Sequence, residues 1–303
     1  MQKDLLCVDE LTKKDLNDIL KLASELKSNR EISSLKPLAG KTVAMIFSKS
    51  STRTRVSFEV GIRELGGSVI YLDQSSTQLG RGETVADTAQ VMSRYLHAIV
   101  IRTYKHSDVV ELAKHANIPV INALTDAYHP CQVLTDLFTI YEYSESFEGI
   151  KLAYLGDGAC NMPNSLILAA KLAGIHLTIG APEEFKPSKD IMDLDFGTGT
   201  VSWETDPKKA CEGADYIYTD VWVSMGCEEE KENRLKVLAP YQVTNELLDC
   251  AAPNVKVLHC LPAHRGEEIS AEVIDGPKSI VFDQAENRLH VQKAIMSLMF
   301  DKK

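Results

Sequence analysis

The chain has 303 residues, enough for two domains of about 100–200 residues each. Hydrophobic residues make up 44% and charged residues 25%, the balance of an ordinary soluble globular protein. Acidic side chains outnumber basic ones by 43 to 33, a net charge of −10, which argues against electrostatic binding to nucleic acid because that needs a basic surface. A local cationic pocket for a small anion is compatible with this charge.

The N-terminal stretch and the cysteines indicate the compartment. Residues 1–15 mix both charges without an apolar core, so we expect no signal peptide. No stretch reaches the roughly 18 apolar residues of a membrane span, so no membrane partner is expected. The seven cysteines are scattered without a CxxC pair, which predicts neither a disulfide framework nor a zinc site. We therefore expect a reduced, cytoplasmic protein.

Short β-branched runs alternate with helical patterns from residue 41 onward. The predicted strands are 42–47, 68–71, 97–102, 119–122, 151–155, 175–180, 199–203, 215–219, 256–259 and 279–282. Because these runs are almost continuously apolar and are separated by helices, they indicate an α/β fold whose parallel sheets are covered by helices on both faces. Each half of the chain is expected to hold a sheet of four to six strands.

The alternation breaks once, at residues 131–146, which have the pattern of one long helix. We place the domain boundary there, which gives domains of residues 1–146 and 147–283. The last segment, 284–303, has a helical apolar pattern and is expected to pack back on the first domain. Long helices would then join the two domains.

The segment Ser51–Arg55 (STRTR) directly follows the first predicted strand and begins a helix. Hydroxyls, backbone N–H groups and guanidinium charge gather there, with Ser50 or Ser51 as the N-cap, and such a helix start suits phosphate. Arg53 and Arg55 lie about 200° apart around a helix, so both should not face one ligand. We expect Arg53 to bind the anion and Arg55 to pack or to form an interdomain salt bridge. The alternative is an ordinary N-cap with two solvated arginines.

Further polar residues stand where predicted strands end. They are Arg102, His129 and Gln132 in the first half, and Asn161, Asp220 and Cys260 in the second. Because ligands of open α/β sheets bind beyond the carboxyl ends of the strands, each set is expected to gather at one edge of its sheet. Taken alone, Asp220 reads as a turn carboxylate and Cys260 as a small buried side chain.

The turn Gly156–Asn161 (GDGACN) is not a dinucleotide-binding fingerprint. Asn161 stands where the third glycine is needed, and the next strand ends at Gly180-Ala181-Pro182, without the acidic residue that would hold a ribose. NAD binding is therefore not expected.

Taken together, the motifs resemble the carbamoyltransferases, and specifically the ornithine branch of that family, over essentially the whole chain. The segments that carry the resemblance are STRTR at 51–55, HPCQ at 129–132, DVWVSMG at 220–226, HCLPAHRGEE at 259–268 and FDQAENR at 282–288. STRTR and HPxQ mark carbamoyltransferases in general, whereas SMG and HCLP mark the ornithine branch. The chain departs from the family pattern at residues 47–50, where FSKS replaces FEKP, and at Cys160 and Pro163, where asparagine and glycine are common.

The resemblance implies transfer of the carbamoyl group from carbamoyl phosphate to the δ-amine of L-ornithine, giving L-citrulline and phosphate, as in arginine biosynthesis. It implies no metal and no cofactor. The first domain would bind carbamoyl phosphate and the second ornithine. It also implies a homotrimer with shared active sites, in which Gln78 reaches the phosphate bound by the neighbouring subunit.

The site residues follow from the same resemblance. Those implied for carbamoyl phosphate are Ser51, Thr52, Arg53, Thr54, Gln78, Arg102, His129, Gln132, Cys260, Leu261 and Arg288. Those implied for ornithine are Asn161, Asp220, Ser224 and Met225. The groups expected to be catalytic are Arg53, Thr54, Arg102, His129 and Cys260.

Two alternatives stay open. One is a carbamoyltransferase for another amine, such as putrescine or an N-acylornithine; Asp220 argues against it, because a free α-amino group needs that carboxylate. The other is a non-catalytic ligand-binding paralogue, against which the retained Arg53, Arg102 and His129 argue. Biosynthesis and arginine breakdown would use the same site, so the sequence leaves the direction open.

Overall fold

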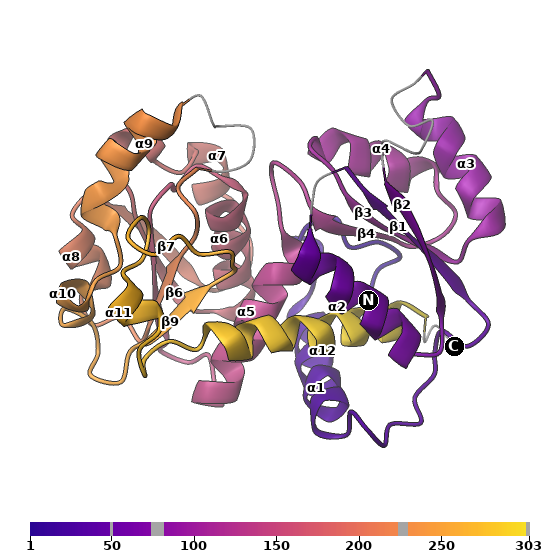
Figure 1. Cartoon of the computed structure of the whole chain (residues 1–303), viewed down its shortest axis with the longest axis horizontal. Helices are drawn as coiled ribbons and strands as arrows, with labels where there is room; N and C mark the ends of the chain where they lie inside the picture. The colour runs from indigo at the N-terminus through magenta and orange to yellow at the C-terminus, as the bar shows by residue number, and fades with distance from the viewer. Residues whose placement is uncertain (49–50, 74–81, 224–229, 301–303) are drawn as a thin grey trace. The chain divides into compact units, whose positions relative to one another are not determined.

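A computed structural model describes residues 1–48, 51–73, 82–223 and 230–300. The chain forms two compact units: unit 1 is Met1–Phe138 with Glu286–Lys303, and unit 2 is Thr139–Ala285. Each unit is a parallel sheet with helices around it (Figure 1), so the predicted α/β class is confirmed. Among the described residues, none of the helices has the length and apolar character that a bilayer crossing needs.

Unit 1 is built on a four-stranded parallel sheet with the order β2-β1-β3-β4. Its strands are β1 (Thr42–Phe47), β2 (Ser68–Asp73), β3 (Ala98–Arg102) and β4 (Val120–Leu124). Its helices are α1 (Lys13–Ser28), α2 (Thr52–Glu64), α3 (Val85–Tyr95) and α4 (His106–His115). The inner strands β1 and β3 are almost wholly buried, as expected when helices cover both faces of the sheet. The edge strand β2 consists of exposed and half-buried residues.

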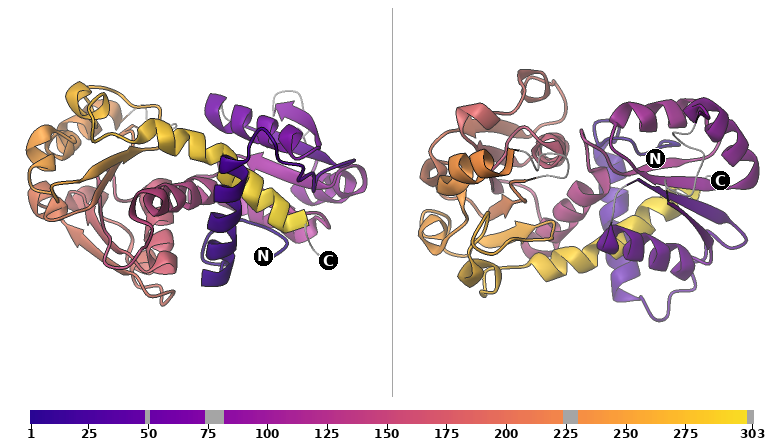
Figure 2. Two further views of the ribbon diagram at one scale, coloured as in Figure 1. Left: turned by 90° about the horizontal axis from the view of Figure 1, so that it is seen from below. Right: turned by 45° about the horizontal axis from the view of Figure 1, so that its top comes forward.

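The two faces of this sheet pack against different helices. Side chains of α3 and α4 form one apolar cluster with β1 and β3. The helix α12 (Val281–Phe300) lies against α2, where a Cβ on Gly61 would stand 3.2 Å from the Lys293 side chain. It also crosses α1, as both views of Figure 2 show, and there Lys27 Nζ donates to Asn287 Oδ1 at 2.7 Å. The C-terminal segment is therefore part of the unit 1 core.

Unit 2 is built on a five-stranded parallel sheet with the order β7-β6-β5-β8-β9. Its strands are β5 (Lys151–Leu155), β6 (His176–Gly180), β7 (Thr200–Glu204), β8 (Tyr216–Thr219) and β9 (Lys256–His259). The unit also contains the end of α5 (Pro130–Ser144), α6 (Asn161–Ala173), η2 (Glu183–Phe185), α7 (Lys189–Met192), α8 (Pro207–Cys211), α9 (Lys231–Leu238), η4 (Ala239–Tyr241), α10 (Asn245–Leu248) and α11 (Ala271–Ile274). The division between the units falls inside α5 on one side and inside α12 on the other.

One predicted strand, 279–282, is wrong. Its first residues do run beside β9, because Ile280 N donates to the Val257 carbonyl at 3.0 Å. The pairing ends after one bridge, since Val281 already begins α12 and Gln284 N donates to the Ile280 carbonyl. The other nine predicted strands are present, in sheets of the expected size. The limits 1–146 and 147–283, and the substrate of each domain, stay predictions.

Candidate active site

The first turn of α2 has the charge pattern of an anion site. It contains no acidic residue, and Thr52 and Arg53 are exposed there. Ser51 occupies the N-cap position, as predicted for Ser50 or Ser51, although its side chain makes no capping hydrogen bond. Its hydroxyl instead accepts from Arg102 Nη1 at 3.2 Å. The helix start thus combines its own positive dipole end with arginine side chains.

Thr54 connects three elements of unit 1. Arg102, the last residue of β3, donates from Nη1 to Thr54 Oγ1 at 3.3 Å, and Arg288 of α12 donates from Nη2 to the same oxygen at 2.5 Å. All three side chains are buried. A hydroxyl has two acceptor lone pairs and one proton, so two guanidinium donors leave Thr54 to act as a donor toward any further partner.

His129 and Gln132 stand at the start of α5. Burial, and then the positive charges of Arg288 and Arg102, hold the pKa of His129 well below its ordinary value of about 6.5. The imidazole is therefore neutral near pH 7 and can donate from one nitrogen only. Gln132 Nε2 donates to Asp136 Oδ1 at 2.8 Å, while Gln132 Oε1 is buried without a hydrogen-bond partner among the described residues.

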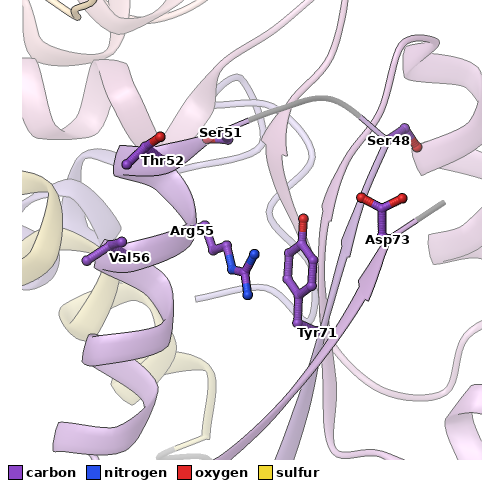
Figure 3. A pocket seen from close by; sticks show the side chains of 7 residues that line it. All are labelled: Ser48, Ser51, Thr52, Arg55, Val56, Tyr71 and Asp73. Atoms are coloured by element: carbon purple, nitrogen blue, oxygen red, sulfur yellow. The ribbon is translucent and has the colours of Figure 1, made fainter. Parts of the chain in front are cut away.

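A pocket opens beside the first turn of α2 (Figure 3). It is lined by Ser48, Ser51, Thr52, Arg55, Val56, Tyr71 and Asp73. The Arg55 guanidinium lies 3.7 Å from the centre of the Tyr71 ring and 3.9 Å from the Glu59 carboxylate of its own helix. Arg55 thus packs against the strand β2, one of the two roles expected for it.

In unit 2, Asp220 and Cys260 meet at the ends of neighbouring strands, β8 and β9. Cys260 Sγ donates to Asp220 Oδ1 at 2.9 Å, and the Val221 backbone N–H donates to the same oxygen at 2.8 Å. Asp220 is only 8% exposed, and this burial raises the pKa of its carboxyl. The geometry therefore brings together two of the residues expected in the ornithine site or beside it.

His259 fixes the backbone next to Cys260. Its Nδ1 accepts from the Leu261 backbone N–H at 2.9 Å, and its Nε2 lies 3.0 Å from Glu268 Oε1. Since Nδ1 accepts, Nε2 must carry the proton and donate to the carboxylate. The His259 and Glu268 side chains are fully buried. The geometry thus assigns the neutral Nε2–H tautomer and holds the turn that carries Leu261.

Two groups of side chains in the described part of the chain have the spacing of metal ligands. One is Asp220, His259 and Cys260, and the other is His264, Glu267 and Glu268. In the first group both ring nitrogens of His259 already have hydrogen-bond partners. In the second, Glu268 Oε1 already accepts from His259 and from the His264 backbone N–H. Neither group therefore offers a complete set of uncommitted ligand atoms.

Asn161 is the first residue of α6, not part of the preceding turn as predicted. Its neighbour Cys160 occupies the N-cap position, and burial, with the charges of Asp157 and Asp220, raises the pKa of that thiol well above 9. The Cys160 thiol lies 3.4 Å from the Asp157 carbonyl oxygen, to which it donates. Gln78, Ser224 and Met225 lie outside the described residues.

Two family models match the chain. The carbamoyl-P binding domain of aspartate/ornithine carbamoyltransferase matches residues 3–142, and the Asp/Orn binding domain matches residues 148–299. The chain belongs to the aspartate/ornithine carbamoyltransferase family. The resemblance seen in the sequence motifs is thereby confirmed, and the two matched domains are those that bind carbamoyl phosphate and the amino acid in this family.

Members of the family resemble the chain over its full length. The ornithine carbamoyltransferase of Syntrophus aciditrophicus is 53% identical over 99% of this chain and 100% of its own. That of Bacillus subtilis is 51% identical over 99% of this chain and 94% of its own. The solved structure of the Pyrococcus furiosus ornithine carbamoyltransferase is 46% identical, with a TM-score of 0.95, and covers 99% of this chain and 98% of its own.

One buried ion pair of unit 2 was missed by the sequence analysis. Arg234 of α9 donates from Nη1 to Asp157 Oδ2 at 2.7 Å, and both side chains are nearly inaccessible. The two residues are 77 positions apart, and neither belongs to a motif that we singled out for binding. The only available signal was an aspartate in a glycine turn after a strand, which is an ordinary turn residue.

Proposed function

We propose that this chain transfers the carbamoyl group of carbamoyl phosphate to the δ-amine of L-ornithine, giving L-citrulline and phosphate. The observation that carries the proposal is the 53% identity, over the full length of both chains, with a protein named ornithine carbamoyltransferase. Relatives that share about half of their residues and both domains support the same reaction.

The residues around Thr54 suit the donor substrate. The α2 N-terminus and Arg53 would hold the phosphate, with Ser51 and Thr52, and would stabilise the charge that grows on it as the C–O bond breaks. The Thr54 hydroxyl, whose lone pairs already accept from two guanidinium groups, would donate to the carbonyl oxygen. Arg102 and neutral His129 supply further donors, so the tetrahedral oxyanion forms among preorganised N–H and O–H groups.

The residues around Asp220 suit the amino-acid substrate. Among the described residues, Cys260 Sγ and the Val221 backbone N–H both donate to Asp220 Oδ1, so an incoming α-ammonium group would bind at Oδ2. Burial disfavours the carboxylate, and a bound ammonium favours it, so binding and ionisation strengthen each other. Asn161 would contact the same end of ornithine. The δ-amine must be neutral to attack, and Cys260 is the proposed neighbour of that amine, not a nucleophile.

The remaining parts of the proposal come from the family resemblance. We propose a homotrimer in which Gln78 completes the phosphate site of the neighbouring subunit. We also propose that Gln132, Arg288, Cys260 and Leu261 contact carbamoyl phosphate, that Ser224 and Met225 contact ornithine, and that the enzyme works in the cytoplasm in arginine biosynthesis.

A citrulline assay on the purified protein tests the reaction. Carbamoyl phosphate is supplied with L-ornithine, putrescine or an N-acylornithine in parallel, and product is measured against time. We expect rapid carbamoylation of ornithine and little of the other two. Faster turnover of putrescine or of the acylated amine would reassign the substrate, and no product from any amine would favour a non-catalytic paralogue.

A further inference from the structure

The guanidinium group of Arg234 ties together four segments of unit 2. Its Nη1 donates to Asp157 Oδ2 at 2.7 Å and to the Trp222 carbonyl at 3.3 Å. Its Nε donates to Glu230 Oε2 at 2.9 Å, and its central carbon lies 4.8 Å from the centre of the Phe185 ring. Three of these partners follow the carboxyl ends of β5, β6 and β8, and the fourth directly precedes α9.

The segments held by Arg234 also approach one another closely through glycine backbone. A Cβ on Gly156 would stand 3.3 Å from the Trp222 ring, and a Cβ on Gly158 would stand 2.7 Å from the Phe185 carbonyl oxygen. Asp157 adds a second constraint, because its Oδ1 accepts from the Ala159 backbone N–H at 2.9 Å. The carboxylate thus fixes the loop that leads into α6 while it also neutralises the arginine.

Two residues proposed to bind ornithine continue directly from these fixed points. Asn161 follows the loop that Asp157 holds, and Asp220 immediately precedes the segment of Trp222. We propose that Arg234 is a positioning residue for ornithine: acting through Asp157 and Trp222, it sets the distance between Asn161 and Asp220. This inference rests on the proposed function, since it assumes that these two residues hold the amino-acid end of the substrate.

Arginine is needed here for its shape as well as its charge. A planar guanidinium can donate in several fixed directions at once, whereas a lysine ammonium is a single point charge on a flexible stem. Arg234→Lys therefore keeps a cation for buried Asp157 but cannot also hold the Trp222 carbonyl and the Glu230 carboxylate. The variant changes the positioning of the loops with a smaller electrostatic disturbance than complete removal of the charge.

The test measures the KM of each substrate and kcat for Arg234→Lys, with Asp157→Asn as a second variant if the first does not fold. Val273→Ala is the control for general destabilisation, because it opens a small void in the same buried core as Phe185 and Trp222 while leaving the Arg234 hydrogen bonds in place. Melting temperatures are recorded for all variants. We expect the KM for ornithine to rise about tenfold or more, the scale of one lost charged hydrogen bond, while the KM for carbamoyl phosphate stays within about twofold.

The result that overturns the inference is a folded Arg234→Lys variant whose ornithine KM stays within about twofold of the wild-type value. An equal rise in Val273→Ala at a similar melting temperature would also overturn it, because general destabilisation would then suffice. Asp220→Asn in the same assay separates this failure from failure of the proposed function. If Asp220→Asn leaves the ornithine KM unchanged, or if the wild-type protein makes no citrulline, the site assignment itself is wrong.

Discussion

Replacing Arg53 by alanine separates catalysis from folding. The side chain is exposed on the first turn of α2, and exposed substitutions of this kind change the free energy of unfolding by about 0.5 kcal/mol or less. If Arg53 stabilises the leaving phosphate, its loss should instead raise the activation free energy by about 2.7–4 kcal/mol, the cost of removing one donor from a developing anion. That corresponds to a fall in kcat of about 10²–10³-fold.

The assay is citrulline formation at saturating concentrations of both substrates, with urea denaturation of the same preparations. Arg63→Ala is the control, because it removes the same charge from the other end of α2, where Arg63 pairs with Glu59 on the surface. The two arginines are about 15 Å apart along the helix axis, beyond the Debye length of about 10 Å at 0.1 M salt. Near-normal kcat in Arg53→Ala would refute the assignment of this arginine to the phosphate.

Three further predictions concern Asp220, His129 and Gln78. Asp220→Asn should weaken ornithine binding by about 30-fold or more, the scale of breaking a buried charge pair, and should leave carbamoyl phosphate binding nearly intact. Calorimetry with carbamoyl phosphate present measures the first effect. Loss of carbamoyl phosphate binding with ornithine binding retained would show that Asp220 is assigned to the wrong substrate. The folded state holds the pKa of His129 below its ordinary value, so below about pH 6.5 the unfolded chain binds a proton that the folded chain does not. Lowering the pH in that range should therefore decrease the free energy of unfolding, by up to about 1.4 kcal/mol per pH unit, and His129→Gln should remove this contribution. Equal pH slopes for both proteins in urea denaturation would contradict the neutral assignment. If active sites are shared between subunits, reassembled mixtures of the Gln78→Ala and Arg102→Ala variants should recover activity. If Gln78→Ala alone is impaired and verified hybrids recover no activity, Gln78 acts in the site of its own subunit.

The strands were predictable where local pattern and burial agree. Residues 43–47 form an unbroken apolar run and lie buried on an inner strand. The segment 279–282 has the same β-branched composition, yet Phe282 is 69% exposed and the chain has already turned into α12. Composition alone could not show this, because only one residue of the segment finds a partner on β9 and the helix that follows supplies its own hydrogen bonds.

The site was predictable in its location and less so in its contacts. Strand ends and a helix start placed Arg102 and the residues after Ser51 at one edge of a sheet, and the hydrogen bonds from Arg102 confirm that these come together. The convergence of two arginines on Thr54 depends on Arg288, which arrives from 234 positions away. The same limit explains why Arg234 was missed: long-range pairing leaves no local pattern in the sequence.

The two helices that contain the divisions between the units bear on how the molecule loses its structure. Because α5 and α12 continue across those divisions, a cut there would end each helix in mid-course. Residues 139–144 would stay with unit 2 as a fragment well below the roughly 12–15 residues that an isolated helix needs in water. Melting of one unit thus shortens helices that the other unit uses, so calorimetry should find the units unfolding as coupled partners and not as independent domains, and a separately expressed half should lose stability at its severed helices.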